Sequence, residues 1–387
     1  MTPPIRALVA RLRAGFPRTS GRPPAFAPGQ SVLIVAELRI PQCAKYRVRQ
    51  KQAYFARLGV PCHVVDWRHT ADCLAAAASA TQAILYRVPA DPPVLALIDT
   101  LHARAIPTAW EVDDLVFDEA AIRQNSNLAS LDAETQAGAL TNARLYRTAM
   151  LACGAGIAST PAIGAAMREA GIDQVTVIEN ALDAETLALA AHFRGQRAAR
   201  RHPGLVITYG SGSTHDADFA QAAPALLRLL ARRPDTRLRI IGDLTLPEGF
   251  ASFEDRVERL PFASFARYLG QLSESDIALA PLEPGAFNDA KSNIKFIEAA
   301  CLAIPTICSP RAHFAGIVRQ GRNGFLAEGE EAWLSALTTL AGSARLRRRI
   351  GKAALRTVLK AYGPDRIAWR QVAPLLRPSV RAPAGNG

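Results

Sequence analysis

The stretch that decides the fold runs from Asn288 to Pro310 and reads NDAKSNIKFIEAACLAIPTICSP. A polar segment that contains a lysine leads into an amphipathic helix, for which Ser292 is the predicted N-cap. The apolar face of this helix consists of Ile294, Ile297 and Cys301. Thr306–Ser309 then reads as a buried strand, so the stretch is typical of an α/β fold.

The start of this helix suits a phosphate group, because the first backbone N–H groups of a helix lack partners and lie at the positive end of its dipole. Lys291 adds a mobile positive charge beside them. Glu298 follows roughly 7–8 Å along the helix at ~1.5 Å per residue, about the distance from a diphosphate to the ribose of one nucleotide. A carboxylate there accepts hydrogen bonds from ribose hydroxyls. The alternative is an ordinary exposed carboxylate on a helix.

This segment resembles the donor-binding region of the retaining GT-B glycosyltransferases (family 4, group 1) of the bacterial surface-polysaccharide type. Their pattern, a helical Glu followed by EA…G-x-P-x-x-x-S, corresponds to Glu298–Ser309, with Ala303 in place of the usual Gly. The resemblance implies that Lys291 and Glu298 act in donor binding and catalysis. It extends the donor site to Asn288, Asp289, Ser292, Asn293 and Ile294. A second family Glu, which contacts the transferred sugar, is replaced here by Ala290, and Asn288 and Asp289 are the nearest polar residues.

A second phosphate-binding feature is the turn that starts at Gly210 and reads GSGSTHD, after the first strand of the second half. Small residues let backbone N–H groups approach a phosphate. The turn resembles the SGxxTHDxDF element of a bacterial subset of these enzymes, which implies donor contacts from Gly210, Ser211, Gly212, Ser213 and His215. His215 would donate to a phosphate oxygen; the alternative is that His215 and Asp216 only cap the next helix. Glu283, at a strand end, contacts the base or sugar or faces solvent.

Two segments of the first half carry candidate residues for the acceptor side. Asp113 and Asp114 lie in a stretch that resembles DxDDLxF, and they would bind acceptor hydroxyls or act as base; a metal site or a structural turn are the alternatives. Lys45, Arg47 and Arg49 resemble the RYRV element that lines the cleft in the family, or they form a basic face on the first helix. The stretch Val177–Asp183 resembles the IPNGVD element, with an expected structural role at the domain join.

Runs typical of strands and of helices alternate along the chain and restart at Leu205, which predicts parallel sheets covered by helices on both faces. The predicted fold is α/β, with two Rossmann-like βαβ domains facing across a cleft (GT-B). The predicted parts are a basic tail and linker (1–30), an acceptor-binding domain (31–185), an interdomain linker (186–203), a nucleotide-sugar-binding domain (204–362), and a helix and tail that cross back to the first domain (363–387).

The predicted strands fall in two groups. They are Ser31–Ala36, Pro61–Trp67, Ala83–Val88, Pro107–Val112, Gly156–Ser159 and Val175–Glu179, then Leu205–Tyr209, Arg237–Ile241, Val257–Leu260, Ile277–Ala280 and Thr306–Ser309. Single helices are expected over Ala44–Leu58 and Ala217–Ala231.

Composition narrows the partners. The 387 residues are enough for two domains, and the net charge of +12 is concentrated in residues 1–30, 194–201 and 332–364. Such patches suit an anionic membrane, nucleic acid or phosphorylated substrates. With only 6% aromatic residues and no zinc-finger or helix-turn-helix pattern, we expect no nucleic acid. A solvated basic face is the alternative for Arg345–Arg349.

We expect a cytoplasmic protein that makes peripheral contact with the anionic inner face of the cytoplasmic membrane. No run of about 18 apolar residues and no apolar signal-peptide core is found. Residues 1–14 are expected to form a basic amphipathic helix or a tail. The six cysteines show no CxxC pair, which favours core positions in a reducing compartment over disulfides or metal ligands.

The resemblance implies a metal-independent hexosyltransferase without a cofactor. It would move a sugar, with retention, from a nucleoside diphosphate sugar to a saccharide or lipid-linked glycan acceptor in cell-surface polysaccharide synthesis. A phosphate oxygen takes the proton of the acceptor, so no protein nucleophile is needed. Two alternatives are a non-catalytic GT-B-like protein that binds nucleotide-sugar or glycan, which Ala290 favours, and a sugar-nucleotide epimerase of the same fold.

Overall fold

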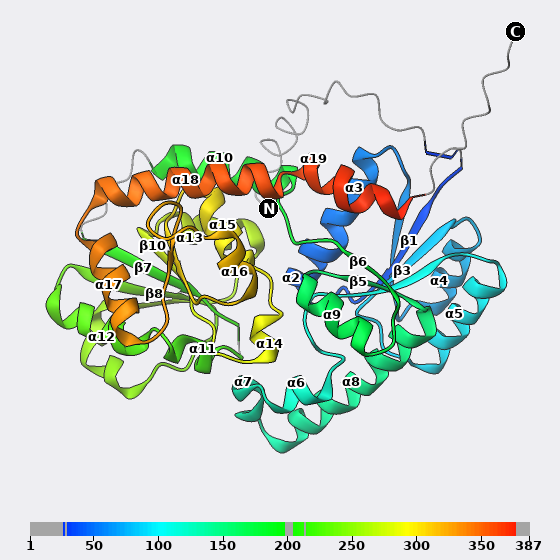
Figure 1. The fold of residues 1–387 in the computed structure, drawn as a ribbon, viewed down its shortest axis with the longest axis horizontal. Helices are drawn as coiled ribbons and strands as arrows, with labels where there is room; N and C mark the ends of the chain where they lie inside the picture. The colour runs from blue at the N-terminus through cyan, green and yellow to red at the C-terminus, as the bar shows by residue number, and fades with distance from the viewer. Residues whose placement is uncertain (1–25, 28, 198–203, 213, 377–387) are drawn as a thin grey trace, which may run out of the picture. The chain divides into compact units, whose positions relative to one another are not determined.

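The computed structural model describes residues 26–27, 29–197, 204–212 and 214–376, which form two compact units (Figure 1). The C-terminal unit contains Arg123–Gln136 and Leu182–Gly363. The N-terminal unit contains Ala137–Ala181 together with the described parts of 17–122 and 364–387. The predicted helix over residues 1–14 lies outside the described residues.

The N-terminal unit has a six-stranded parallel sheet in the order β2-β1-β3-β4-β5-β6. Its central strands are apolar runs such as VLIVA in β1, all five residues of which are buried, as expected for strands covered on both faces. The strands are β1 (Val32–Ala36), β2 (Cys62–Asp66), β3 (Gln82–Tyr86), β4 (Thr108–Val112), β5 (Ala155–Ala158) and β6 (Gln174–Val177). The helices before the return of the chain are α2 (Pro41–Cys43), α3 (Gln50–Arg57), α4 (Thr70–Ala77), α5 (Pro92–Ala103), α6 (Glu119–Arg123), α8 (Ala133–Cys153) and α9 (Pro161–Glu169), of which α6 and α8 each extend into the C-terminal unit.

The C-terminal unit repeats this plan with the order β12-β11-β10-β7-β8-β9, again all parallel. The strands are β7 (Leu205–Gly210), β8 (Thr236–Ile241), β9 (Val257–Leu260), β10 (Ile277–Ala280), β11 (Thr306–Cys308) and β12 (Phe325–Leu326). The helices are α7 (Ser126–Ala129), α10 (Ala184–Arg197), α11 (Asp216–Ala220), α12 (Ala223–Arg232), the 3₁₀ segment η2 (Glu248–Arg256), α13 (Phe265–Ser273), α14 (Ala286–Asp289), α15 (Ile294–Cys301), α16 (Ala312–Ile317), α17 (Glu330–Ala341) and α18 (Ala344–Tyr362).

Helices cover both faces of the C-terminal sheet. On one side α10 packs on α13 and α15 packs on α18, and on the other α12 packs on α17 (Figure 1). The predicted pair of Rossmann-like α/β domains is therefore confirmed. Every predicted strand is present, whereas β12, α6, α7, α14, α16 and η2 were not predicted.

The predicted interdomain linker over residues 186–203 is described up to residue 197, and all of this part is helical. Residues 184–197 form α10, which packs against α13. Asp183 accepts a hydrogen bond of 2.7 Å from the backbone N–H of Thr186, as an N-cap residue does. Leu189 and Ala190 are fully buried, so the segment has an apolar face that the arginines nearby obscured in the sequence.

Two predicted single helices are also interrupted. The helix predicted over Ala217–Ala231 breaks between α11 and α12, because Pro224 is compatible only with the first turn of a helix. The helix predicted over Ala44–Leu58 begins with a π-helical segment, η1 (Ala44–Arg49), before α3. Ser292 is not the N-cap of α15; the preceding residue of that helix is Asn293, whose side chain does not cap it.

The chain returns to the N-terminal unit after α18, as predicted, through α19 (Pro364–Ile367) and the short segments η3 (Ala368–Val372) and η4 (Ala373–Leu375). Asp365 pairs with Arg57 of α3. Gln371 accepts a hydrogen bond from the backbone N–H of Glu179 and donates one to its carboxylate, at 2.8 and 2.7 Å.

Ala303, which replaces the usual Gly of the family pattern, follows α15 with φ of 57°. This left-handed conformation favours glycine, so the alanine carries a strain of roughly 1 kcal/mol. Gly351 of α18 packs on the same turn: a Cβ atom built on Gly351 would lie 2.0 Å from the carbonyl oxygen of Ala303. α15 and α18 therefore approach closely only because position 351 lacks a side chain.

We expect Gly351→Ala to lower the free energy of unfolding by about 2 kcal/mol or more, because the added methyl group must push the two helices apart. Gly138→Ala is the matched control, since nothing lies within 4 Å of a Cβ atom there in helix α8. That change should stabilise the protein by up to about 1 kcal/mol. Urea denaturation of both variants tests the contact, and equal effects would contradict it.

Candidate functional site

The candidate site lies at the carboxyl edge of the C-terminal sheet, where parallel α/β sheets bind ligands. β7 and β10 are neighbours in that sheet. The turn after β7 begins at Gly210, and the segment after β10 contains α14 and the start of α15. The two predicted phosphate-binding features therefore share one edge. Gly212 is close to the ring of His215, and Ser213 lies outside the described residues.

Asp218, on α11, is the centre of the site. Its carboxylate is fully buried and accepts hydrogen bonds from the backbone N–H of Glu283 (2.9 Å) and the side-chain amide of Asn288 (2.7 Å). Its other oxygen lies 2.7 Å from Nδ1 of His215 and 3.5 Å from Nζ of Lys291. Burial alone would raise the pKa of Asp218, but the bond from His215 and the charge of Lys291 hold the pKa well below its usual range.

His215 is the N-cap residue of α11, but its side chain makes no capping hydrogen bond. Burial and the nearby charge of Lys295 lower its pKa to about 4. Because an ionised Asp218 only accepts hydrogen bonds, the proton of the neutral ring is on Nδ1, and Nε2 is an acceptor. Donation from Nε2 to a phosphate, as predicted, therefore requires the imidazolium form.

Glu298 is 7% exposed, so the alternative of an exposed helix carboxylate is wrong. The hydroxyl of Tyr268, on α13, donates to it over 2.9 Å. Tyr268 also packs against the start of the turn, because a Cβ atom built on Gly210 would lie 3.0 Å from the tyrosine oxygen. A carboxylate at this depth of the helix is an acceptor of hydrogen bonds, as the interpretation of Glu298 as a ribose ligand requires.

The remaining predicted donor residues differ in surroundings. Glu283 accepts a hydrogen bond of 2.9 Å from Ser126, and Asn127 accepts one from the backbone N–H of Ala217, so α7 packs beside this edge. Asn293 is buried and donates to the hydroxyl of Tyr362 over 2.7 Å. The others differ in exposure: Asn288 is buried, Asp289 exposed, and Ser211 buried, whereas Ser292 and Ile294 are half-buried.

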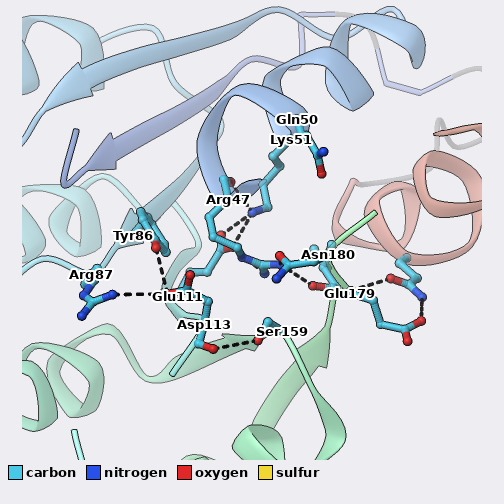
Figure 2. Close-up of polar contacts among 12 residues, drawn as sticks. Arg47, Gln50, Lys51, Tyr86, Arg87, Glu111, Asp113, Ser159, Glu179 and Asn180 are labelled. Atoms are coloured by element: carbon cyan, nitrogen blue, oxygen red, sulfur yellow. Dashed lines mark hydrogen bonds and ion pairs between the residues drawn. The ribbon is translucent and has the colours of Figure 1, made fainter. Parts of the chain in front are cut away.

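In the N-terminal unit, Asp113 lies at the end of β4, near Arg87 (Figure 2). It accepts a hydrogen bond of 2.8 Å from the hydroxyl of Tyr86, and the charged groups of Arg87 and Asp113 are 3.6 Å apart. Asp114 is adjacent and half-buried. Among the described residues, no group of three or more His, Cys, Asp or Glu side chains is placed to hold a metal ion.

Arg47 has an internal partner (Figure 2). Its guanidinium, 1% exposed, donates to Glu111 (2.8 Å), to the carbonyl of Ile178 (2.7 Å) and to Asn180 (2.9 Å). Lys51 also bonds the carboxylate of Glu111, at 2.6 Å to Oε2, and burial lowers the pKa of Lys51 to about 8. Arg47, predicted to contact a donor or acceptor, therefore has its hydrogen-bond partners within the N-terminal unit. Lys45 is buried and Arg49 exposed.

Sequence reasoning missed Tyr268, Lys295, Lys51 and Glu111. The six cysteines are all free, and four of them are buried. In the described part of the chain, no helix is long and apolar enough to span a membrane.

Comparisons with known proteins agree with this fold. Residues 222–371, 150 of the 387, match the family model described as glycosyl transferase-like. No curated protein matches the sequence. Similar solved structures include Anabaena HepE in complex with UDP (14% identity, 89% of this chain and 99% of that chain, TM-score 0.59). A glycosyltransferase from Rickettsia africae is also similar (13% identity, 89% of this chain and 97% of that chain, TM-score 0.60). So is sucrose-phosphate synthase from Thermosynechococcus elongatus (15% identity, 89% of this chain and 98% of that chain, TM-score 0.59).

The two Rossmann-like units and the family match together confirm the resemblance to GT-B group 1 glycosyltransferases.

We expect Glu111→Gln to lower the free energy of unfolding by about 3–5 kcal/mol, because it leaves Arg47 and Lys51 buried without a counter-charge. Glu119→Gln is the control, since its pair with Arg144 is on the surface, and it should leave stability unchanged. Denaturant titration gives both values, and similar losses would refute a special role for the buried pair.

The pKa of His215 predicts a pH effect on stability. The ring is neutral down to about pH 4 when folded, whereas the unfolded chain binds the proton near pH 6.5. The free energy of unfolding should therefore fall by roughly 2 kcal/mol from this group as the pH drops from about 6.5 to 4. His215→Gln should remove this part of the slope, and His102→Gln, at an exposed position, should not. Identical slopes would refute the assignment.

Proposed function

We propose that the protein is a glycosyltransferase that takes its sugar from a nucleoside diphosphate sugar. The observation that carries the proposal is the family match over residues 222–371, because it covers the segment with Lys291 and Glu298. The geometry supports it. A glycine-containing turn, the N-terminus of α15 and a cation share one sheet edge, with a buried carboxylate one turn into the helix. The Anabaena structures contain UDP and UDP-glucose.

In this proposal the donor's ribose hydroxyls donate to Glu298, and Tyr268 holds that carboxylate in position. The diphosphate lies against the backbone N–H groups at Gly210–Gly212 and at the start of α15, near Lys291. The sugar lies toward Asn288, Asp289 and Glu283. Donors placed in advance around a leaving diphosphate lower the barrier for transfer, because they require no rearrangement during the reaction.

The finer parts of the proposal follow the resemblance. We propose retention of configuration, no metal cofactor, and a saccharide or lipid-linked glycan acceptor in cell-surface polysaccharide synthesis. Asp113 and Asp114, with exposed Arg49, are the proposed acceptor-side residues. The setting is the cytoplasm, with peripheral contact to an anionic membrane. Arginines and lysines along α18 support that contact, since the exposed side chains at 345, 348, 349, 352, 356 and 360 are all basic.

One observation favours a second candidate, a nucleotide-sugar-binding protein without turnover. The family's sugar-contacting Glu is replaced by Ala290, which is 2% exposed and offers no polar side chain. Release of nucleoside diphosphate from the matching nucleotide sugar, in the presence of glycan acceptors, distinguishes the two functions. Binding without release supports the second.

The first test is a thermal-shift titration with UDP, GDP, ADP and dTDP. We expect one of them to raise the melting temperature, because a ligand that binds only the folded state stabilises it. Glu298→Ala should lower the affinity for that nucleotide by about tenfold or more, because a charged hydrogen-bond acceptor is lost.

Glu254→Ala, at an exposed position of the same unit, should keep the wild-type shift. The absence of a shift with every nucleotide at millimolar concentration would overturn the donor site. An equal loss of the thermal shift in both variants would show that Glu298 is not part of the donor site.

A further inference from the structure

Lys295 is a buried cation that the donor-site residues above do not include. It is the second residue of α15, and its Nζ lies 4.2 Å from the centre of the Tyr209 ring. This nitrogen is shut off from solvent, and no described residue accepts a hydrogen bond from it. An ammonium has three N–H donors, and burying them without acceptors is costly. Among the described residues, therefore, no acceptor satisfies these N–H groups.

The location of Nζ indicates what that partner is. Tyr209 immediately precedes Gly210, the first residue of the turn after β7, whereas Lys295 belongs to the first turn of α15. The side chain thus reaches from one phosphate-binding feature to the base of the other. A ligand group bound by both features would lie near this ammonium.

Lys291, His215 and Glu298, at the same edge, each have a partner within the protein. Lys291 faces Asp218 at 3.5 Å, and Nδ1 of His215 is bonded to the same carboxylate. Glu298 accepts a hydrogen bond from Tyr268. A cation–π contact with Tyr209 stabilises Lys295 but satisfies none of its N–H groups.

We propose that Lys295 binds the diphosphate of the nucleotide-sugar donor and stabilises it as a leaving group. This inference rests on the proposed function. In the transfer step, the bond between the sugar's anomeric carbon and the phosphate oxygen breaks, and its electron pair stays on that oxygen. The acceptor oxygen bonds to the anomeric carbon, and its proton passes to a phosphate oxygen. Lys295 neutralises the charge that develops on the diphosphate.

Donor binding is then coupled to protonation. Burial lowers the pKa of Lys295 to about 8; Asp218 and Glu298 oppose this shift, and Lys291 adds to it. The other groups that face it are the Tyr209 ring and His215, which is neutral in this range. A diphosphate beside Nζ favours the charged form and raises the pKa. Binding above pH 8 therefore takes up a proton, and affinity falls as the pH rises.

The experiment is isothermal titration calorimetry with UDP, GDP, ADP and dTDP, and with the nucleoside of whichever diphosphate binds. The proteins are wild type, Lys295→Met and Lys352→Met, the last at an exposed position of α18. We expect Lys295→Met to lower the affinity for the nucleoside diphosphate by about 10- to 100-fold, as for the loss of a charged hydrogen bond. The affinity for the nucleoside should not change. Lys352→Met should match wild type.

A diphosphate affinity equal to wild type in Lys295→Met would overturn the inference while the proposed function stands. If wild type binds none of the four diphosphates, the proposed function itself fails. The wild-type pH profile is independent of whether the variant folds: diphosphate affinity should fall between about pH 7.5 and 9.5. A flat profile overturns the inference. A purely structural lysine predicts a lower melting temperature in the variant, whereas an unpartnered one predicts an equal or higher value.

Discussion

The buried carboxylate of Asp218 holds the candidate site together. It accepts hydrogen bonds from the backbone N–H of Glu283, from the side-chain amide of Asn288 in α14 and from the ring of His215. It also faces the ammonium of Lys291. Two segments that are distant in sequence, 215–218 and 283–291, are thereby connected through one side chain. An ionised carboxylate without partners would be costly in this interior, so each of these groups is confined to a narrow range of positions. Their arrangement exists before any ligand binds.

This arrangement has consequences for the charge that remains. The carboxylate of Asp218 faces the ammonium of Lys291 and accepts a hydrogen bond from Nδ1 of His215. Both groups are therefore less available to a ligand than the sequence alone suggests. The ammonium of Lys295 lies over the ring of Tyr209, and no described residue accepts a hydrogen bond from it. A protein optimised for stability alone would place an apolar side chain there. Keeping an unpartnered ammonium at a sheet edge lowers stability, and such losses are typical of sites shaped by binding.

The sequence predicted what depends on local pattern. Alternating strands and helices, the loop before α15 and the position of Glu298 follow from periodicity and motif spacing over a few residues. The partners of these residues do not follow from it. Tyr268 meets Glu298 from another helix, and Glu111 meets Arg47 across 64 positions of the chain. The error at Ser292 has a smaller cause, since Ser292 and Asn293 are both acceptable caps and only the backbone distinguishes them. The helix α10 was missed because arginines and small residues masked its apolar face.

Arg47 and Lys295 show why burial of a cation does not by itself identify a ligand site. Both side chains end away from solvent, and Arg47 belongs to a motif that resembles a ligand-contacting element. Yet Arg47 bonds Glu111 and the carbonyl of Ile178, and Gln50 bonds the carbonyl of Ala181, immediately before the chain enters the C-terminal unit at Leu182. These contacts anchor the connecting segment within the N-terminal unit, which is a structural role. A buried charge that forms an ion pair and hydrogen bonds within its own unit supports the fold, whereas an ammonium whose N–H groups have no described acceptor supports the proposal of an anionic ligand.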